Sequence, residues 1–526
     1  MKSLLITSAV FFGTCFVYIL IMLSATEGYF TYILDDAYIH LAIAKNFAVH
    51  GIWGITEYSF SSSSSSPVFT LILSVLIFIF GNHALIPLIF NIAATVLLII
   101  LLNKYYSLYF SKTILIIAAS LFTLFFAVLH VQIVSGMEHV LQVSVIAANI
   151  YFFYQWRVYR TRYSLYCLYG TILLLGLIRF ESMFYFVSLA FVFLLVRKFK
   201  HAALILLLGF TPIFLFGYFN YPESGYFFPN SVVVKGTLLD FSGNVVIQVF
   251  DLVIKKLILN ISFYKIGLFP LLISFILLYK DYKKEGGFRK VIESNFLIVV
   301  WSLTLIQHCL FSEIKGVFRY EAYLLCAFAM VLIPRLKSFF VHPLSAFKTE
   351  KITGVFIIVN VILLLYKFGY AHVVITNGSS NIYEQQIQSA GFLKEYYNTE
   401  HVVANDIGAI CYFTDIHLLD FMGLGSNEMV RFRIGGKKLD QEFEDFLLQY
   451  TIKNKYKLAI AYEEWLDGHT PKNWKKVAYL EVKGRNVVLA EKHLFIYSID
   501  PDIHESLKQN VKNFKWNKNV QVTIME

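Results

Sequence analysis

The sequence predicts a polytopic α-helical membrane protein with a small α/β domain at its C-terminal end. The 526 residues are 57% hydrophobic and 15% charged, whereas soluble domains have about 45–50% apolar and roughly 25% charged residues. Apolar runs of helical length recur through the first 370 residues, and the hydropathy falls abruptly after them. These observations exclude a soluble enzyme and a disordered chain.

About eleven apolar segments are expected to span the membrane. The first covers Leu4 to Leu23, and we interpret it as an uncleaved helix because no Ala-x-Ala cleavage pattern follows it. The other ten lie near residues 84–102, 113–130, 139–156, 164–178, 183–196, 202–218, 264–279, 294–310, 320–334 and 352–370. The segment from Pro67 to Phe80 is too short to cross, and we expect a re-entrant or juxtamembrane helix on the outer side.

Basic residues between these segments orient the chain. Five loops carry them: Lys104 and Lys112; Arg157, Arg160 and Arg162; Arg197, Lys198 and Lys200; Lys280, Lys283, Lys284, Arg289 and Lys290; Arg335, Lys337, Lys348 and Lys351. The positive-inside rule places these loops and Lys2 in the cytoplasm. We therefore expect an integral protein of the plasma (inner) membrane, surrounded by lipid, with a cytoplasmic N-terminus and an extracytoplasmic C-terminal domain. The net charge of +10 is assigned to these loops, so no nucleic-acid partner is expected.

The fall in hydropathy predicts two domains: a transmembrane domain over residues 1–370, with an outer loop at 25–66, and an extracytoplasmic α/β domain over 371–526. In the second domain we expect helices at Tyr383–Tyr397 and Asp440–Tyr450 and strands at Lys457–Ala461, Val477–Val482, Val487–Leu489 and Leu494–Ser498. The six serines Ser61–Ser66 are expected to form a flexible loop. The five cysteines predict neither a disulfide framework nor a zinc site, because none has ligand-type spacing.

Adjacent carboxylates at the start of the outer loop are the strongest candidates for chemistry. Asp35 and Asp36 open a helical pattern just after the first apolar segment, and His40 lies one turn later on the face of Asp36. One interpretation is that the pair caps the helix and compensates its dipole. Another is that one carboxylate is a general base that the other orients, or that the pair with His40 binds a divalent cation, Mg²⁺ or Mn²⁺.

Glu138 is a further candidate catalytic carboxylate. It lies between two apolar runs, at the outer end of a predicted span. A charge in this position is costly unless it is paired or functional.

Short motifs along the chain, all on the predicted outer face, resemble those of GT-C glycosyltransferases, which are polytopic enzymes that use polyprenyl-phosphate sugars. The motifs are Asp35-Asp36-Ala37-Tyr38 and the residues up to Gly54, Ser66-Pro67, Ser135-Gly136-Met137-Glu138, Arg179-Phe180-Glu181-Ser182, Phe228-Pro229-Asn230 with Lys235, Arg319-Tyr320, and Asp406–Ile410 with Leu419–Leu424. The most similar branch contains the mycobacterial transferase that adds terminal β-arabinofuranosyl residues. The sequence departs from that pattern at Lys45, Phe180 and the serine run.

The resemblance implies roles for the outer-face residues. A lipid-phosphate sugar donor needs cations beside its phosphate and a carboxylate that takes the acceptor proton. The catalytic carboxylates are then Asp35, Asp36 and Glu138, and the donor-phosphate or substrate contacts are Arg179, Lys235, Arg319, His40, Tyr226 and Asn230. Simpler interpretations stay open: a snorkelling Arg179, a solvated Lys235, an Arg319–Glu321 ion pair and an interfacial Tyr226.

The predicted function is inverting transfer of a sugar from a polyprenyl-phosphate donor to a cell-envelope glycan or glycolipid acceptor on the outer face. The alternatives are a transporter or flippase of a lipid-linked or polar substrate, and a non-catalytic scaffold. A transporter should show inverted repeats and charges near the midplane, whereas here the ionisable residues gather at the outer ends of spans. A scaffold leaves these polar residues unexplained, so the sequence favours the enzyme.

Overall fold

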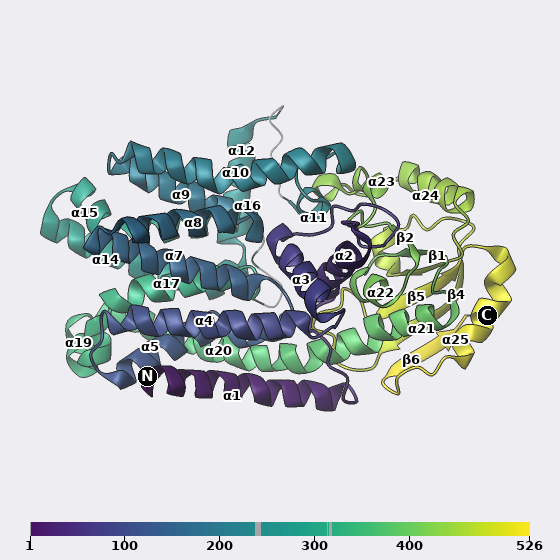
Figure 1. Cartoon of the computed structure of the whole chain (residues 1–526), viewed down its shortest axis with the longest axis horizontal. Helices are drawn as coiled ribbons and strands as arrows, with labels where there is room; N and C mark the ends of the chain where they lie inside the picture. The colour runs from purple at the N-terminus through teal and green to yellow at the C-terminus, as the bar shows by residue number, and fades with distance from the viewer. Residues whose placement is uncertain (1, 237–242, 313, 315–317, 526) are drawn as a thin grey trace.

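The computed structural model describes residues 2–236, 243–312, 314 and 318–525, and these residues form a helical bundle with a mixed β-sheet packed against one end (Figure 1). The long helices of the bundle are α1 (Lys2–Ala25), α4 (Ile86–Ser107), α5 (Thr113–Phe126), α7 (His139–Tyr159), α8 (Arg162–Ile178), α9 (Ser182–Leu195), α10 (Phe199–Ser224), α14 (Phe269–Glu285), α16 (Phe296–Phe311), α17 (Ala322–Arg335) and α20 (Lys351–Ile382). One hydrophobic core runs from Phe11 in α1 to Val520 in the sheet, so the bundle and the sheet pack together.

Shorter segments connect these helices. They are α6 (Leu129–Ser135), α11 (Asn230–Lys235), α12 (Val245–Val253), α13 (Ile261–Phe263), α15 (Phe288–Ser294), α18 (Lys337–Val341) and α19 (Pro343–Thr349), with π-helical turns η1 (Ile254–Ile258) and η2 (Tyr264–Leu268).

Helix covers most of every predicted span. Five helical stretches of the described chain are long and apolar enough to cross a membrane: α1, α4, α10, Ile261–Lys284 and Lys351–Tyr396. Two bent pairs, α5 with α6 at 51° and α15 with α16 at 89°, bring the number to seven if each pair is one span. The protein is therefore an integral membrane protein, while the full set of eleven spans remains a prediction.

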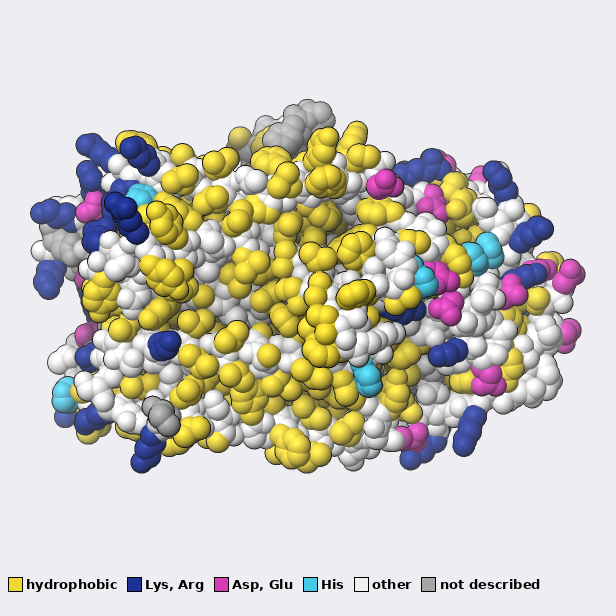
Figure 2. Space-filling view, in the orientation of Figure 1, with side chains coloured by type: hydrophobic (Ala, Val, Ile, Leu, Met, Phe, Trp, Pro, Cys, Tyr) yellow, Lys and Arg dark blue, Asp and Glu magenta, His cyan; other side chains and the backbone are white. Residues whose placement is uncertain are grey.

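Charge divides the two ends of the molecule. Lys and Arg side chains gather at the end that holds α15, α19 and the N-terminus, and a broad apolar surface separates them from the mixed charges of the sheet domain (Figures 1 and 2). The basic loops and the N-terminus thus share one end, and the C-terminal domain occupies the other.

Two short helices lie between the bundle and the sheet (Figure 1). Helix α2 (Asp36–His50) ends at Gly51, which adopts the left-handed conformation, with φ of 71°, that favours glycine at a helix C-terminus. Helix α3 (Pro67–Phe80) starts with proline at its first turn, where the missing N–H costs nothing. Its 14 residues agree with the expected short helix.

The C-terminal sheet has the strand order β2-β1-β3-β5-β4-β6. Its strands are β1 (His401–Ala404), β2 (His417–Asp420), β3 (Leu458–Ala461), β4 (Lys475–Val482), β5 (His493–Ser498) and β6 (Val520–Ile524). Strands β2, β1 and β3 are parallel, whereas β5, β4 and β6 are paired antiparallel. The helical segments around the sheet are η3 (Tyr383–Ile387), α21 (Gln388–Tyr396), α22 (Gly408–Phe413), α23 (Asn427–Val430), η4 (Ile434–Gly436), α24 (Gln441–Lys453), η5 (Glu463–Leu466), η6 (Pro501–Ile503) and α25 (His504–Asn513).

Three details of the C-terminal part differ from the sequence-based expectation. The strand predicted at 487–489 is wrong, because the Val487 N–H donates to the Asn381 side chain instead of to a neighbouring strand. Strands β1, β2 and β6 were not anticipated. The fall in hydropathy near residue 370 lies inside one helical stretch, Lys351–Tyr396, and marks where side chains become polar rather than where the helix ends.

Candidate active site

Asp35 joins the outer loop to the C-terminal domain. Its two carboxylate oxygens accept hydrogen bonds from the backbone N–H groups of Gly408, at 2.7 Å, and Ala409, at 2.8 Å. The approach requires glycine, since a Cβ at residue 408 would lie 2.2 Å from the Asp35 carbonyl oxygen. Burial and the charge of Asp406 raise the pKa of Asp35, although the two N–H groups oppose the shift. Asp35 therefore holds the start of α22 against the start of α2.

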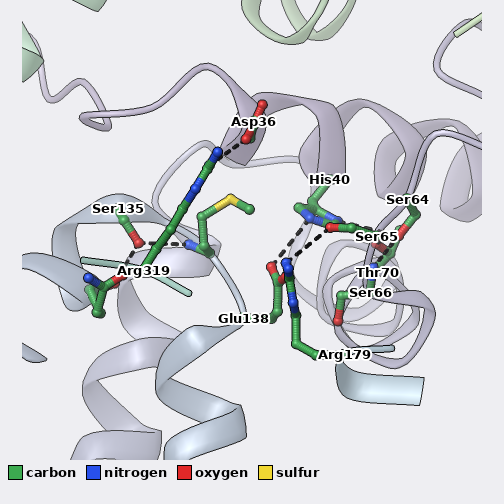
Figure 3. Close-up of polar contacts among 12 residues, drawn as sticks. Asp36, His40, Ser64, Ser65, Ser66, Thr70, Ser135, Glu138, Arg179 and Arg319 are labelled. Carbon is green, nitrogen blue, oxygen red and sulfur yellow. Dashed lines mark hydrogen bonds and ion pairs between the residues drawn. The ribbon is translucent and has the colours of Figure 1, made fainter. Parts of the chain in front are cut away.

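Asp36, the next residue, pairs with Arg319, and the charge of Lys235 also acts on it. Nη1 of Arg319 donates to Asp36 Oδ2 at 2.5 Å (Figure 3). Burial alone would raise the pKa of Asp36, but Arg319 and Lys235 hold it well below its usual range. Lys235, at the end of α11, is exposed and forms no ion pair with any described residue. The Asp36 side chain is 33% exposed, so this charged group can be reached from outside.

The aromatic ring of Tyr320 lies close to both arginines of the site, Arg179 and Arg319. The guanidinium carbon of Arg179 lies 5.2 Å from the centre of the Tyr320 ring, and that of Arg319 lies 4.7 Å from it. Both distances are within cation–π range. The ring can thus stabilise both guanidinium groups.

Arg179 and Glu138 form a buried ion-pair cluster beside His40 (Figure 3). Nη1 of Arg179 donates to Glu138 Oε1 at 2.5 Å, and its Nε donates to Glu181 Oε2 at 3.0 Å. His40 Nε2 lies 3.4 Å from Glu138 Oε2, and its Nδ1 lies 2.7 Å from the hydroxyl of Thr70. Glu138 is fully buried and Arg179 is only 7% exposed. Arg179 is thus held by two carboxylates, Glu138 and Glu181.

The serine run is not a flexible loop, contrary to expectation. Five of its six residues are buried: Ser61, Ser62, Ser63, Ser64 and Ser66. Ser62 donates to Asn220 Oδ1 in α10 at 2.6 Å, and Ser63 donates to the Leu424 carbonyl of the C-terminal domain at 2.8 Å. Small hydroxyl side chains allow this close packing and satisfy backbone and amide groups at the same time.

Asn230 has the same joining role from α11. It is fully buried, and its Nδ2 donates to Asn427 Oδ1 at 2.8 Å and to the Leu424 carbonyl at 3.3 Å. Tyr226 is half-buried, and its carbonyl accepts from Asn220 Nδ2 at 2.9 Å. These contacts place the predicted Asn230 and Tyr226 at the junction of the domains.

Asp406 is a further carboxylate of the site, and the sequence resemblance places it in the motif Asp406–Ile410, which is expected on the acceptor side. Asp406 follows β1, and its Oδ2 lies 2.8 Å from the hydroxyl of Tyr462 and accepts from Gln386 Nε2 at 2.7 Å. Burial and the charge of Asp36 raise the pKa of Asp406. Its position directly after a parallel strand was the signal, but β1 itself was not predicted.

The donor set around the Asp pair does not fit a divalent cation. Both Asp35 oxygens already accept backbone N–H groups, and Asp36 faces Arg319. Among the described residues, no group of three His, Cys, Asp or Glu side chains has a metal-binding arrangement. Hard cations such as Mg²⁺ need several free oxygen ligands.

Comparison with known proteins supports the fold more than any particular activity. Residues 380–497 match a family described only as a domain of unknown function, DUF8728. None of the curated protein sequences matches the chain significantly. Two solved structures of ArnT from Cupriavidus metallidurans are similar over 94% of this chain and 98% of theirs: one bound to undecaprenyl phosphate, with a TM-score of 0.51 and 12% identity, and one in the apo state, with 0.52 and 13%. The chain therefore has the fold of ArnT.

Proposed function

We propose that the protein is an inverting glycosyltransferase that moves a sugar from a polyprenyl-phosphate donor to a glycan or glycolipid acceptor on the outer face of the membrane. One observation carries the proposal: Asp36 is paired with Arg319 at the sheet-domain end of the bundle, and the charge of a second cation, Lys235, acts on it. A carboxylate beside two cations is the set that sugar transfer from a phosphate needs. The fold supports it, because a structure of ArnT with this fold holds undecaprenyl phosphate.

Arg319 and Lys235 are the proposed contacts of the donor phosphate. Arg319 offers planar, bidentate donors, and Lys235 is exposed with no ion pair to a described residue. Together they supply positive charge beside the donor phosphate. This is the charge that a divalent cation on the Asp pair would otherwise provide. Arg179 is less suited to this role, because Glu138 and Glu181 already neutralise it. We assign Arg179, Glu138 and His40 to positioning the loop and the wall of the site.

Asp36 is the proposed general base, and donor binding prepares it. Arg319 and Lys235 lower its pKa, which makes it a weak base. When a donor phosphate takes over these cations, Asp36 loses its partners and its pKa rises. Binding of the first substrate thus activates the group that deprotonates the second.

The transfer is a single displacement. The acceptor hydroxyl gives its proton to Asp36, and its oxygen forms a bond to the anomeric carbon of the donor. The bond from that carbon to the phosphate oxygen breaks, and its electron pair leaves with polyprenyl phosphate. Arg319 and Lys235 stabilise the charge gained by the leaving group, and one displacement inverts the anomeric configuration.

The orientation is part of the proposal. The N-terminus and the basic loops share one end of the molecule, so that end is assigned to the cytoplasm. The C-terminal domain, with Asp35, Asp36 and the cations beside it, then lies outside.

Transfer can be tested with purified full-length protein in nanodiscs and a panel of radiolabelled polyprenyl-phosphate sugars. We expect wild-type protein to release polyprenyl phosphate from at least one donor, and the Asp36→Asn variant to release far less. The Asp445→Asn variant, which changes an exposed carboxylate of α24, is the matched control. If the wild type cleaves no donor with or without acceptor extract, the proposal is wrong.

A further inference from the structure

The C-terminal sheet contains a topological switch point. The chain passes from β1 to β2 on one side of β1 and then returns to β3 on its other side, and all three strands are parallel. At a switch point, the connections from the carboxyl ends of two neighbouring parallel strands run in opposite directions. Open α/β sheets bind ligands in the crevice that this leaves at the carboxyl ends. Asn405 and Asp406 follow β1 at this position, and Tyr462 follows β3.

Polar side chains from three segments meet there. The Tyr462 hydroxyl lies 2.8 Å from Asp406 Oδ2 and 2.5 Å from Gln385 Oε1, so its single proton has two acceptors. Gln385 and Gln386 come from the π-helical turn η3, a distortion frequent at functional sites. We call Gln385, Gln386, Asn405, Asp406 and Tyr462 the switch-point cluster.

The cluster retains unused hydrogen-bonding capacity. Asp406 is partly exposed, and its Oδ1 accepts no hydrogen bond from a described residue. Gln386 Oε1 and Asn405 Nδ2 are buried without a hydrogen-bond partner among the described residues. Buried polar groups normally have partners. Asp406 Oδ1 is the free acceptor of the cluster that a ligand can reach, and a sugar hydroxyl can donate to it.

The cluster also lies beside the proposed reaction centre. Gly408 and Ala409, two and three residues after Asp406, hold the Asp35 carboxylate. Asp36 and Lys235 are near enough for their charges to act on Asp406. Asp406 is therefore two residues from the backbone that holds Asp35, the chain neighbour of Asp36. The carboxylates of Asp35, Asp36 and Asp406 stand beside two cations, Arg319 and Lys235, which are assigned to the donor phosphate. An uncharged sugar is therefore the suitable class for the acceptor.

We propose that the switch-point cluster binds an uncharged sugar of the acceptor and directs one of its hydroxyls toward Asp36. The assignment rests on the proposed function and deepens it by naming the acceptor class. In this arrangement the bundle binds the donor and the C-terminal domain binds the acceptor. Asp406 is the substrate contact, and the fully buried Tyr462 is a positioning residue that holds the Asp406 carboxylate. The donor phosphate is left to Arg319 and Lys235.

The test uses full-length protein in nanodiscs with methyl glycosides of glucose, galactose, mannose and arabinose as probes. Saturation-transfer NMR measures their binding, and release of polyprenyl phosphate without acceptor measures donor cleavage. Wild-type protein should bind at least one glycoside. Tyr462→Phe and Asp406→Asn should each weaken that binding about tenfold, as expected for loss of a hydrogen bond to a charged group.

Matched controls separate binding from folding. Tyr397→Phe removes another buried hydroxyl of the same domain, which contacts Asn510 at 3.0 Å, and Asp445→Asn removes an exposed carboxylate. Both should bind glycoside as the wild type does. If Asp406→Asn fails to fold, Tyr462→Phe decides alone.

The outcomes distinguish the two proposals. No glycoside binding to the wild type, or unchanged binding to Tyr462→Phe, overturns the acceptor site even if donors are cleaved. Glycoside binding that Tyr462→Phe abolishes supports the sugar site even if every donor stays intact, and in that case the proposed transfer reaction is what fails.

Discussion

The guanidinium of Arg319 lies 2.5 Å from the carboxylate of Asp36, although 283 residues separate the two in the chain. The pair joins the loop before α17 to the start of α2. It also gives Arg319 two competing partners, since a donor phosphate would draw it away from Asp36. The same arginine therefore links donor binding to the basicity of the proposed catalytic carboxylate.

Replacing Asp36 should remove catalysis with little effect on folding. Asp36→Asn keeps the size of the side chain but removes the proposed base, so transfer should fall about 10²–10⁴-fold. Thermal unfolding in detergent should change little, because the side chain is partly exposed. Full turnover by this variant, measured with a cleaved donor, would contradict the assignment.

The neighbouring carboxylate should behave differently. In the wild type, the two carboxylate oxygens of Asp35 accept from the backbone N–H groups of Gly408 and Ala409. Asp35→Asn replaces one of these oxygens with an NH₂ donor, so one of the two hydrogen bonds is lost and two donors face each other. We expect a lower Tm and a partial loss of transfer, since Asp35 holds the domains together. A variant with unchanged Tm but no transfer would make Asp35 the base instead.

Arg319 and Lys235 should act on the donor. Arg319→Gln is expected to raise donor KM and to lower kcat about 10²-fold, because the leaving phosphate gains charge in the transition state. Arg319→Lys should restore only part of the rate, since lysine lacks the bidentate geometry. Lys235→Gln should change the same constants in the same direction without lowering Tm. Lys394→Gln, at an exposed lysine of α21, serves as the control.

Donor kinetics identify the phosphate contacts. Unchanged donor KM and kcat in both neutral variants would show that the phosphate binds elsewhere, with Arg179 as the next candidate.

The sequence predicts the helical part of the fold because long apolar runs have few alternatives in a membrane. It also identifies Asp35 and Asp36, because adjacent carboxylates follow an apolar segment and match a motif. It could not predict that Asp35 accepts from Gly408 and Ala409, since that contact spans 373 residues. The composition of the run Ser61–Ser66 likewise does not predict whether these serines are solvated or buried. Their burial depends on partners distant in the sequence, such as the Leu424 carbonyl that accepts from Ser63.

Gly408→Ala should weaken the contact between the C-terminal domain and the loop that carries Asp35. The added Cβ would lie 2.2 Å from the Asp35 carbonyl and 2.7 Å from its carboxylate, so the backbone must move. Overpacking of this kind costs about 1–3 kcal/mol, and we expect a lower Tm and slower transfer. Gly391→Ala in α21 is the control, because its Cβ would meet Phe514 at an ordinary 3.4 Å. Equal Tm values for the two variants would show that residue 408 does not need glycine.

The pH dependence should differ between kcat/KM and kcat. The ionised form of Asp36 is required, and in the free enzyme its pKa lies well below the usual value. The acid limb of kcat/KM, which reports the free enzyme, should therefore lie below about pH 4. Donor phosphate neutralises Arg319 and Lys235, so the acid limb of kcat should lie at higher pH. Arg319→Gln should move the limb of kcat/KM upward, and coincident limbs in wild type and variant would contradict the coupling.

The topology can be checked with single cysteines in a background where the partly exposed native Cys167 is replaced by serine. Asp502→Cys lies on the C-terminal domain and Lys283→Cys near the end of α14, both at exposed positions. If the basic end is cytoplasmic, a membrane-impermeant maleimide should label residue 502 in intact cells and residue 283 only after permeabilisation. The other four native cysteines are buried and should stay unlabelled in the folded protein. Labelling of residue 283 but not 502 in intact cells would reverse the orientation, and it would place Asp36 on the cytoplasmic side, where the acceptor could not be an outer-face glycan.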